Sequence, residues 1–192
     1  FDEATNTVQD VKTIYRSTPE MILNPSLKMG GGIAFDREGH LFVTIGPRSV
    51  DTPEAAAVSQ QLDTTLGKVI RITTDGAPAP GNPFLGQPGI APEIWAIGLR
   101  SPEGLTVDSS TGKLWVTDHG MMGGDELNLI GKGKNYGWPA ITYGLAYSGK
   151  PFQGDLAKKP GMEEPNYYWD PVIAPSSVAV YRGAAFPKWN GN

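Results

Sequence analysis

Residues 32–46 read GIAFDREGHLFVTIG, and residues 104–120 read GLTVDSSTGKLWVTDHG. In both segments apolar residues alternate up to an aspartate, a turn containing glycine follows, and a second strand has the form Leu-aromatic-Val-Thr. Alternating apolar strands joined by a polar turn with glycine are typical of a β-hairpin. The two copies begin about 72 residues apart, so the chain carries an internal repeat.

The rest of the chain predicts further short strands and little helix. Strands are expected at 69–72, 93–97 and 127–130, and one short helix near 53–62. A weaker third copy of the hairpin begins at 175–181. Repeated hairpins with few helices predict an all-β fold, and a β-propeller fits this pattern best.

The repeat spacing predicts the extent of that propeller. A chain of 192 residues holds about three blades at this spacing. Propellers close with about 4–8 blades, because an open arc leaves strand edges and blade faces uncovered. We therefore expect a piece of a larger ring, or a homodimer in which a second copy completes it. A small open sandwich is the alternative.

Composition excludes several classes of protein. The 25 glycines and 17 prolines rule out a helical bundle, while 5 Trp, 7 Tyr and 6 Phe supply a core. The net charge of −4 argues against a nucleic-acid surface, and no apolar stretch approaches the ~18 residues of a membrane span. Cysteine is absent, which removes disulfides and thiolate sites. The polar, acidic start at Phe1 contains no signal peptide, and we expect an internal segment.

One loop gathers chemically useful groups after a predicted strand. Residues 118–126 read DHGMMGGDE, with three carboxylates, an imidazole and three glycines. Carboxylates and freely approached carbonyls suit a hard cation such as Ca²⁺. A polar turn with a solvated face explains the same composition equally well.

Three other residues were weighed singly. Arg100 follows a predicted strand, and its guanidinium suits a ligand carboxylate, although a solvated surface arginine is the common case. His40 is expected to be a solvated turn residue, and Trp138 a core residue at a chain corner. Phosphate-loop, dinucleotide, zinc-protease and serine-hydrolase motifs are all absent from the sequence.

Four consecutive blocks carry a family resemblance. They are LGKVIRITTDGAPAPGNPF, EIWAIGLRSPEGLTVD, DHGMMGGDELNLIGKGKNYGWP and YWDPVIAPSSVAVY. Together they resemble the soluble pyrroloquinoline quinone (PQQ)-dependent aldose sugar dehydrogenases, the glucose/sorbosone dehydrogenase family, over essentially the whole chain. The resemblance implies half of a six-bladed β-propeller, with residues 1–192 as one partial domain. It also implies oxidation of the C1 hydroxyl of an aldose to a lactone.

The resemblance assigns roles to particular residues. Cofactor-binding positions are Arg100, Ser101, His119, Gly120, Met121 and Asp125. Main-chain carbonyls of Gly120 and Met121 are expected to bind a catalytic Ca²⁺. Glu126 and the carbonyl of Tyr136 are expected to bind a second, structural Ca²⁺. An aldose is the implied substrate, the electron acceptor is left open, and the implied location is periplasmic or secreted.

The sequence also departs from the family pattern. Lys28 stands where the family has its histidine base, Gly32 where it has an arginine, and Pro47 where it has the acid that orients the histidine. Ser101 replaces an asparagine and Met121 a proline. A lysine with its ordinary pKa of ~10.4 is a poor base near neutral pH. No catalytic base is therefore assigned, and impaired catalysis is predicted. The alternative is a non-catalytic propeller segment that binds a ligand or a protein, with structural calcium.

Overall fold

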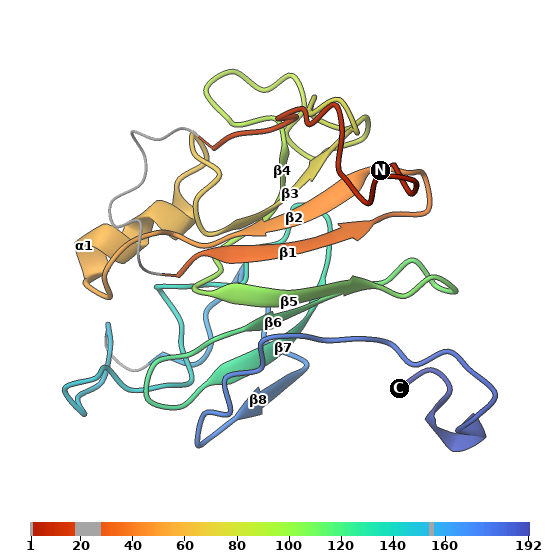
Figure 1. Ribbon diagram of the computed structural model, residues 1–192. Coiled ribbons are helices and arrows are strands. Elements are labelled where there is room, and N and C mark those ends of the chain that lie inside the picture. The colour runs from red at the N-terminus through yellow and green to blue at the C-terminus, as the bar shows by residue number, and fades with distance from the viewer. Residues whose placement is uncertain (1, 18–27, 154–155) are drawn as a thin grey trace.

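The computed structural model describes residues 2–17, 28–153 and 156–192, and these form two four-stranded antiparallel β-sheets (Figure 1). The first sheet has the order β1-β2-β3-β4, with strands Gly30–Phe35, Leu41–Ile45, Lys68–Ile72 and Ile94–Ile97. The second has the order β5-β6-β7-β8. Its strands are Pro102–Val107, Leu114–Asp118, Asp125–Ile130 and Tyr167–Trp169. The predicted all-β class is confirmed.

Both repeated segments form the predicted hairpins. Ile33 pairs with Val43 in the first hairpin, and Leu105 pairs with Val116 in the second. Each first strand also has a register shift near its start, so the two copies agree in irregularity as well as in pairing. The repeat in sequence is therefore a repeat of one structural unit.

The two sheets meet along their first strands. β1 and β5 lie side by side (Figure 1), and Gly32 allows this close approach. A Cβ atom at Gly32 would lie 2.7 Å from the Cβ of Leu105, too close for any side chain. One buried apolar cluster draws residues from both sheets: Phe42, Val69, Ala96, Leu99, Leu114, Val116, Ile130 and Tyr136. Burial of this shared cluster holds the sheets together.

The predicted helix near 53–62 is shorter than expected. α1 spans Pro53–Ala56 and continues as a 3₁₀ helix, η2, at Ala57–Gln60. The Thr52 hydroxyl caps α1 by accepting a hydrogen bond from Ala55 N, and proline at the first position suits a helix start. The buried Lys68 ammonium donates to the carbonyls of Val58 and Ser59, at 3.0 Å each. These carbonyls would otherwise extend an α-helical ladder, so tertiary contacts shorten the helix.

Residues 175–181, where a weaker third copy of the hairpin begins in the sequence, form no strand. This segment runs along β5 instead, and the Pro175 carbonyl accepts a hydrogen bond from the Thr117 hydroxyl at 2.6 Å. It is followed by one 3₁₀ turn, η3, at Pro187–Trp189. The count of about three blades stays a prediction. None of the described helices is long and apolar enough to cross a membrane.

Candidate functional site

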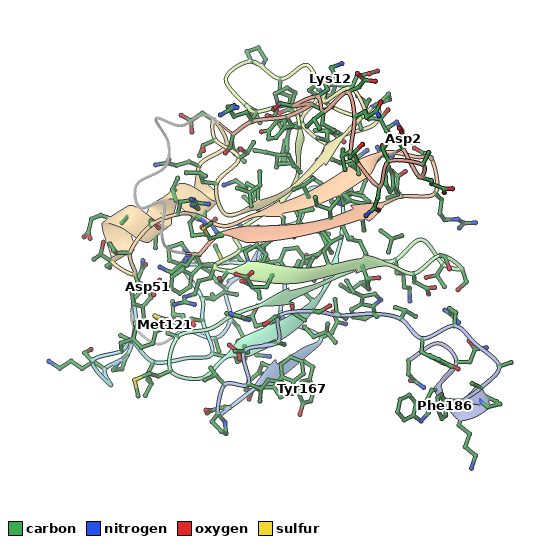
Figure 2. The ribbon with its side chains drawn as sticks, in the orientation of Figure 1. Asp2, Lys12, Asp51, Met121, Tyr167 and Phe186 are labelled. Atoms are coloured by element: carbon green, nitrogen blue, oxygen red, sulfur yellow. The ribbon has the colours of Figure 1, made fainter. Side chains whose placement is uncertain are left out.

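A cavity of about 560 Å³ opens where loops from both sheets meet. All six residues that the sequence assigns to cofactor binding line it: Arg100, Ser101, His119, Gly120, Met121 and Asp125. Lys28, at the family's base position, lines it as well. In Figure 2, Asp51 from the first sheet and Met121 from the second lie at the same end of the molecule. The fold thus gathers residues that are far apart in sequence.

Arg100 is the most firmly held side chain of this cavity. Its Nη1 atom donates to the carbonyl of His119 at 2.8 Å and also to that of Gly120. Its guanidinium carbon lies 5.4 Å from the ring centre of Trp138, a cation–π contact. Trp138 in turn stacks on Phe152 in a small apolar cluster, which confirms its predicted core position. Arg100 is therefore fixed before any ligand arrives.

The backbone around Arg100 is fixed by a buried carboxylate. Asp118, at the end of β6, accepts hydrogen bonds from the backbone N–H groups of Arg100 and Ser101. Burial raises the pKa of Asp118 to about 6, although these hydrogen bonds and the Arg100 charge oppose the rise. The Ser101 hydroxyl donates to Glu103 at 2.9 Å. Ser101 thus contributes to the cavity wall while its hydroxyl is already engaged.

Asp125, the first residue of β7, binds two other segments through their backbone. Its Oδ1 accepts from Gly120 N at 2.8 Å, and its Oδ2 accepts from Ile173 N at 2.8 Å and Ala174 N at 2.7 Å. Three backbone donors satisfy this carboxylate well. Asp125 therefore shapes the cavity wall through the backbone.

His119 offers an unused polar atom. Its Nε2 atom is buried and has no hydrogen-bond partner among the described residues. A buried ring nitrogen of this kind is costly unless a further group pairs with it. In the cavity wall, it is suited to hydrogen-bond a ligand oxygen or N–H group.

Lys28 differs from the expectation for its position. The sequence shows no carboxylate partner for it, yet Lys28 Nζ lies 3.0 Å from Asp51 Oδ1 and also donates to the Ser49 carbonyl. Lys28 is therefore held in place, because the loop after β2 supplies both of these partners. Burial lowers the pKa of Lys28, and Asp51 opposes that change.

Asp51 is the residue that sequence reasoning missed. It bridges Lys28 and Arg100, since its Oδ2 lies 2.6 Å from Arg100 Nη2. The available signal was its position in the sequence. Asp51 lies four residues after Pro47, and Pro47 stands where the family has its acid. Tyr147 was missed as well, and its hydroxyl lies 3.3 Å from Arg100 Nη2. Neither residue stands in a repeated motif.

A second, narrow cavity lies beneath the first. Glu126 and Tyr136, the expected ligands of a structural Ca²⁺, both line it together with Asp118. Burial raises the pKa of Glu126 to about 8, and the neighbouring Asp118 and Asp125 charges add to the rise. Nearby, Asn128 Oδ1 is buried and lacks a partner among the described residues. Crowded carboxylates and an unpaired oxygen are the donor chemistry that a hard cation needs.

The site expected to bind a catalytic Ca²⁺ differs from the narrow cavity in how many of its oxygen atoms already have partners. Gly120 O already accepts from Arg100, and Asp51 and Asp125 are engaged elsewhere. A carbonyl has two lone pairs, so Gly120 O can still take a second partner. Calcium binds six to eight oxygens, and most of them would have to come from a ligand and water. This set fits a cation only together with an oxygen-rich ligand.

His40 is not the solvated turn residue that was expected. Its Nδ1 atom lies 2.9 Å from Arg71 Nη2, and Asp36 and Glu38 complete the group. Asp36, Glu38 and His40 are close enough to hold a metal ion, but the Arg71 guanidinium stands among them. The group is an ion-pair network at the far end of β2.

Comparison with known proteins identifies the family of this chain. The family model of glucose/sorbosone dehydrogenases matches residues 1–192. The chain is 38% identical over 185 residues to the aldose sugar dehydrogenase YliI of Escherichia coli, covering 95% of this chain and 47% of that protein. The chain thus spans about half the length of this relative.

Solved structures show the same likeness. A crystal structure of a glucose dehydrogenase matches with a TM-score of 0.90 at 39% identity, covering 98% of this chain and 53% of that one. The PQQ-bound form of an aldose sugar dehydrogenase from Streptomyces coelicolor matches with a TM-score of 0.58 at 32% identity. That match covers 77% of this chain and 37% of that one.

Proposed function

Because this chain belongs to the glucose/sorbosone dehydrogenase family, we propose that the cavity around Arg100 binds PQQ with Ca²⁺ and accepts an aldose for oxidation at C1. The observation that carries the proposal is that all six cofactor positions of the family pattern line one cavity around a pre-fixed arginine. The β-propeller fold of the family supplies the scaffold.

We assign the following parts to the chain's own residues. Arg100 binds a carboxylate or carbonyl oxygen of the quinone, and His119 Nε2 hydrogen-bonds its edge. The carbonyls of Gly120 and Met121 offer oxygens to Ca²⁺. PQQ, when bound, supplies the hydride acceptor. Met121 packs against Trp138 and Phe152, which keeps this wall dry.

Proton removal is the weak step in this proposal. A general base must be able to accept the hydroxyl proton. Lys28 Nζ donates to Ser49 O and pairs with Asp51, so it is held as an ammonium ion with no free lone pair. We therefore propose impaired sugar oxidation in this chain, as the sequence departure at this position predicts.

Glu126 and the main-chain carbonyl of Tyr136 make up the proposed structural calcium site. Its support is the buried carboxylate pair in the narrow cavity, whose charges a divalent cation would neutralise. A periplasmic or secreted location is proposed on family membership alone.

The test is a redox assay with a binding control. Purified chain is given PQQ, CaCl₂ and glucose, and reduction of dichlorophenolindophenol is followed. We expect slow turnover that needs both PQQ and calcium. Arg100→Gln should weaken PQQ binding about tenfold to a hundredfold, since it removes charged hydrogen bonds. Arg37→Gln changes an exposed arginine outside the cavity and should leave PQQ binding unchanged.

Two results would contradict the proposal. Failure of PQQ to bind in the presence of calcium would remove its basis. PQQ binding without any sugar oxidation would favour the alternative, a non-catalytic segment that binds ligands.

A further inference from the structure

The Asp51 carboxylate holds two cations at once. Its Oδ1 lies 3.0 Å from Lys28 Nζ and its Oδ2 lies 2.6 Å from Arg100 Nη2. All three side chains are largely buried, with 12% of Asp51, 9% of Lys28 and 7% of Arg100 exposed. A carboxylate between an ammonium and a guanidinium is a bound anion in chemical terms. The protein's own side chain thus shows that this position binds carboxylates.

Arg100 does not depend on Asp51 for its position. Its Nη1 atom is held by the carbonyls of His119 and Gly120, and its guanidinium carbon lies 5.4 Å from the ring centre of Trp138. Asp51 contacts the other edge, at Nη2. That edge is therefore the part of Arg100 that a ligand can take over while the side chain stays in place.

The charge balance of the cavity points the same way. The other carboxylate in its wall, Asp125, is already satisfied by three backbone N–H groups. Among the described residues lining the cavity, Asp51 is the only carboxylate paired with Lys28 and Arg100. Moving it away would leave the buried Lys28 ammonium without its paired carboxylate and would open the Nη2 edge of Arg100, which favours an incoming anion.

Asp51 is also placed where it can move. It lies in the loop between β2 and α1, outside any helix or strand, and it lines the cavity itself. We propose that Lys28 and Arg100 form a carboxylate-binding subsite, that Asp51 fills it as an internal counter-ion, and that a carboxylate-bearing ligand displaces Asp51 from Arg100. This goes beyond the proposed oxidation, because it assigns binding roles to Lys28 and Asp51 that do not require turnover.

Two sources could bring the carboxylate: the quinone cofactor or an acidic sugar. Titration calorimetry without calcium or dye separates them. The probes are PQQ, D-glucuronate and D-glucose, the last two differing by a carboxylate in place of a CH₂OH group. The variants are Asp51→Asn and Lys28→Met. Asp75→Asn and Lys113→Met are matched controls at exposed positions outside the cavity.

Asp51→Asn should tighten binding of a carboxylate probe about tenfold or more, because an opposing charge within reach of both cations is removed. Lys28→Met should weaken it by a similar factor. Glucose binding should not change in either variant, and the two controls should behave as wild type. An effect on PQQ alone assigns the carboxylate to the cofactor, and an effect on glucuronate assigns it to the substrate.

The proposal is overturned if Asp51→Asn weakens or leaves unchanged the binding of both PQQ and glucuronate. If Asp51→Asn does not fold, wild type and Lys28→Met decide. Equal affinity of these two chains for each carboxylate probe overturns the proposal, and a weaker Lys28→Met supports it. Lack of turnover in the redox assay bears on the proposed function only, because no redox step enters this test.

Discussion

At the base position of the cavity, an ammonium group stands where the family pattern has an imidazole. Lys28 is a donor there, held by Asp51 and the Ser49 carbonyl. The acid missing at Pro47 is supplied from four residues later in the same loop. Under the proposed function, this position has a carboxylate partner in Asp51 but no group that accepts a proton.

Lys28→His is the residue-scale prediction for catalysis. Histidine has an ordinary pKa of ~6.5, and Asp51 lies close enough to orient it, so PQQ-dependent dye reduction with glucose should rise about tenfold or more. The rate is compared in Lys28→His, in Lys28→His with Pro47→Asp, and in the exposed control Lys113→His. No gain in either cavity variant, once PQQ binding is demonstrated, would show that more than the base is missing.

Glu126→Gln is the prediction for calcium. Calcium bound at Glu126 should raise the Tm of the wild-type chain. The expected rise is about 2–4 °C for each kcal/mol by which calcium binding stabilises the folded state. Glu126→Gln should abolish this dependence, because it removes the charged ligand from the narrow cavity. Thermal unfolding with CaCl₂ or with EGTA measures the effect, and Glu3→Gln at an exposed position is the control. A calcium-dependent Tm that survives in Glu126→Gln would disprove the assignment.

At the scale of elements, side-chain hydrogen bonds and ion pairs hold the segments that lie outside the strands. Lys68, on β3, donates to three carbonyls, Val58 O, Ser59 O and Leu66 O, and so fixes η2 against the sheet. Burial lowers the pKa of Lys68 to about 7, so its ammonium form depends on these three acceptors. The segment after β8 is held in a similar way, by Arg182 on Asp108.

The Asp108–Arg182 pair predicts how that segment responds to pH. Arg182 and the neighbouring Thr111 hydroxyl hold the pKa of Asp108 below its ordinary value. A carboxyl group whose pKa is lower in the folded chain than in the unfolded chain stabilises the fold at pH values above its unfolded pKa of ~3.9. This contribution disappears as the pH falls through the lowered pKa. The segment should therefore stay docked at pH 5 to 7 and loosen only below about pH 4.

Hydrogen exchange over 175–186 tests this expectation. Asp108→Asn should raise the exchange rate of this segment at pH 7 relative to wild type, and Asp75→Asn should not. Equal exchange in Asp108→Asn and wild type would mean that the ion pair does not anchor the segment.

At the scale of the whole molecule, the arrangement leaves apolar surface uncovered. On β1, Ile33 is 63% exposed and Phe35 is 60% exposed. Phe186 and Trp189, close to Asn192, are exposed as well. Apolar burial contributes about 25 cal/mol per Å², and the net stability of a domain is only about 5–15 kcal/mol. Such faces would be covered in a closed ring.

The chain by itself is therefore expected to self-associate, with two copies forming a homodimer through an isologous interface. Sedimentation velocity at micromolar concentration should show a species of twice the 20.5 kDa chain mass. Ile33→Lys should shift the distribution toward the monomer. A compact, cooperatively melting monomer with a high midpoint would refute the expectation.

The sequence by itself determined the parts of this protein that depend on near neighbours. Strand alternation, glycine turns and the 32–46 and 104–120 repeat are local signals, so the hairpins were predictable. The expected cofactor positions around Arg100 and His119 stand in contiguous motifs, and the structure brings them into one cavity. The length of α1 was not predictable, because the Lys68 side chain on β3 donates a hydrogen bond to the Val58 carbonyl.

Only the tertiary structure decided what joins distant segments. The pairing of Asp51 with both Lys28 and Arg100 spans 23 and 49 residues of sequence, and no local pattern encodes it. The same holds for the docking of 175–182, where the Pro175 carbonyl accepts from Thr117 on β6 and Arg182 pairs with Asp108. Ion pairs and strand pairing depend on distance in space between residues, and this distance is set by the tertiary fold and not by separation along the sequence.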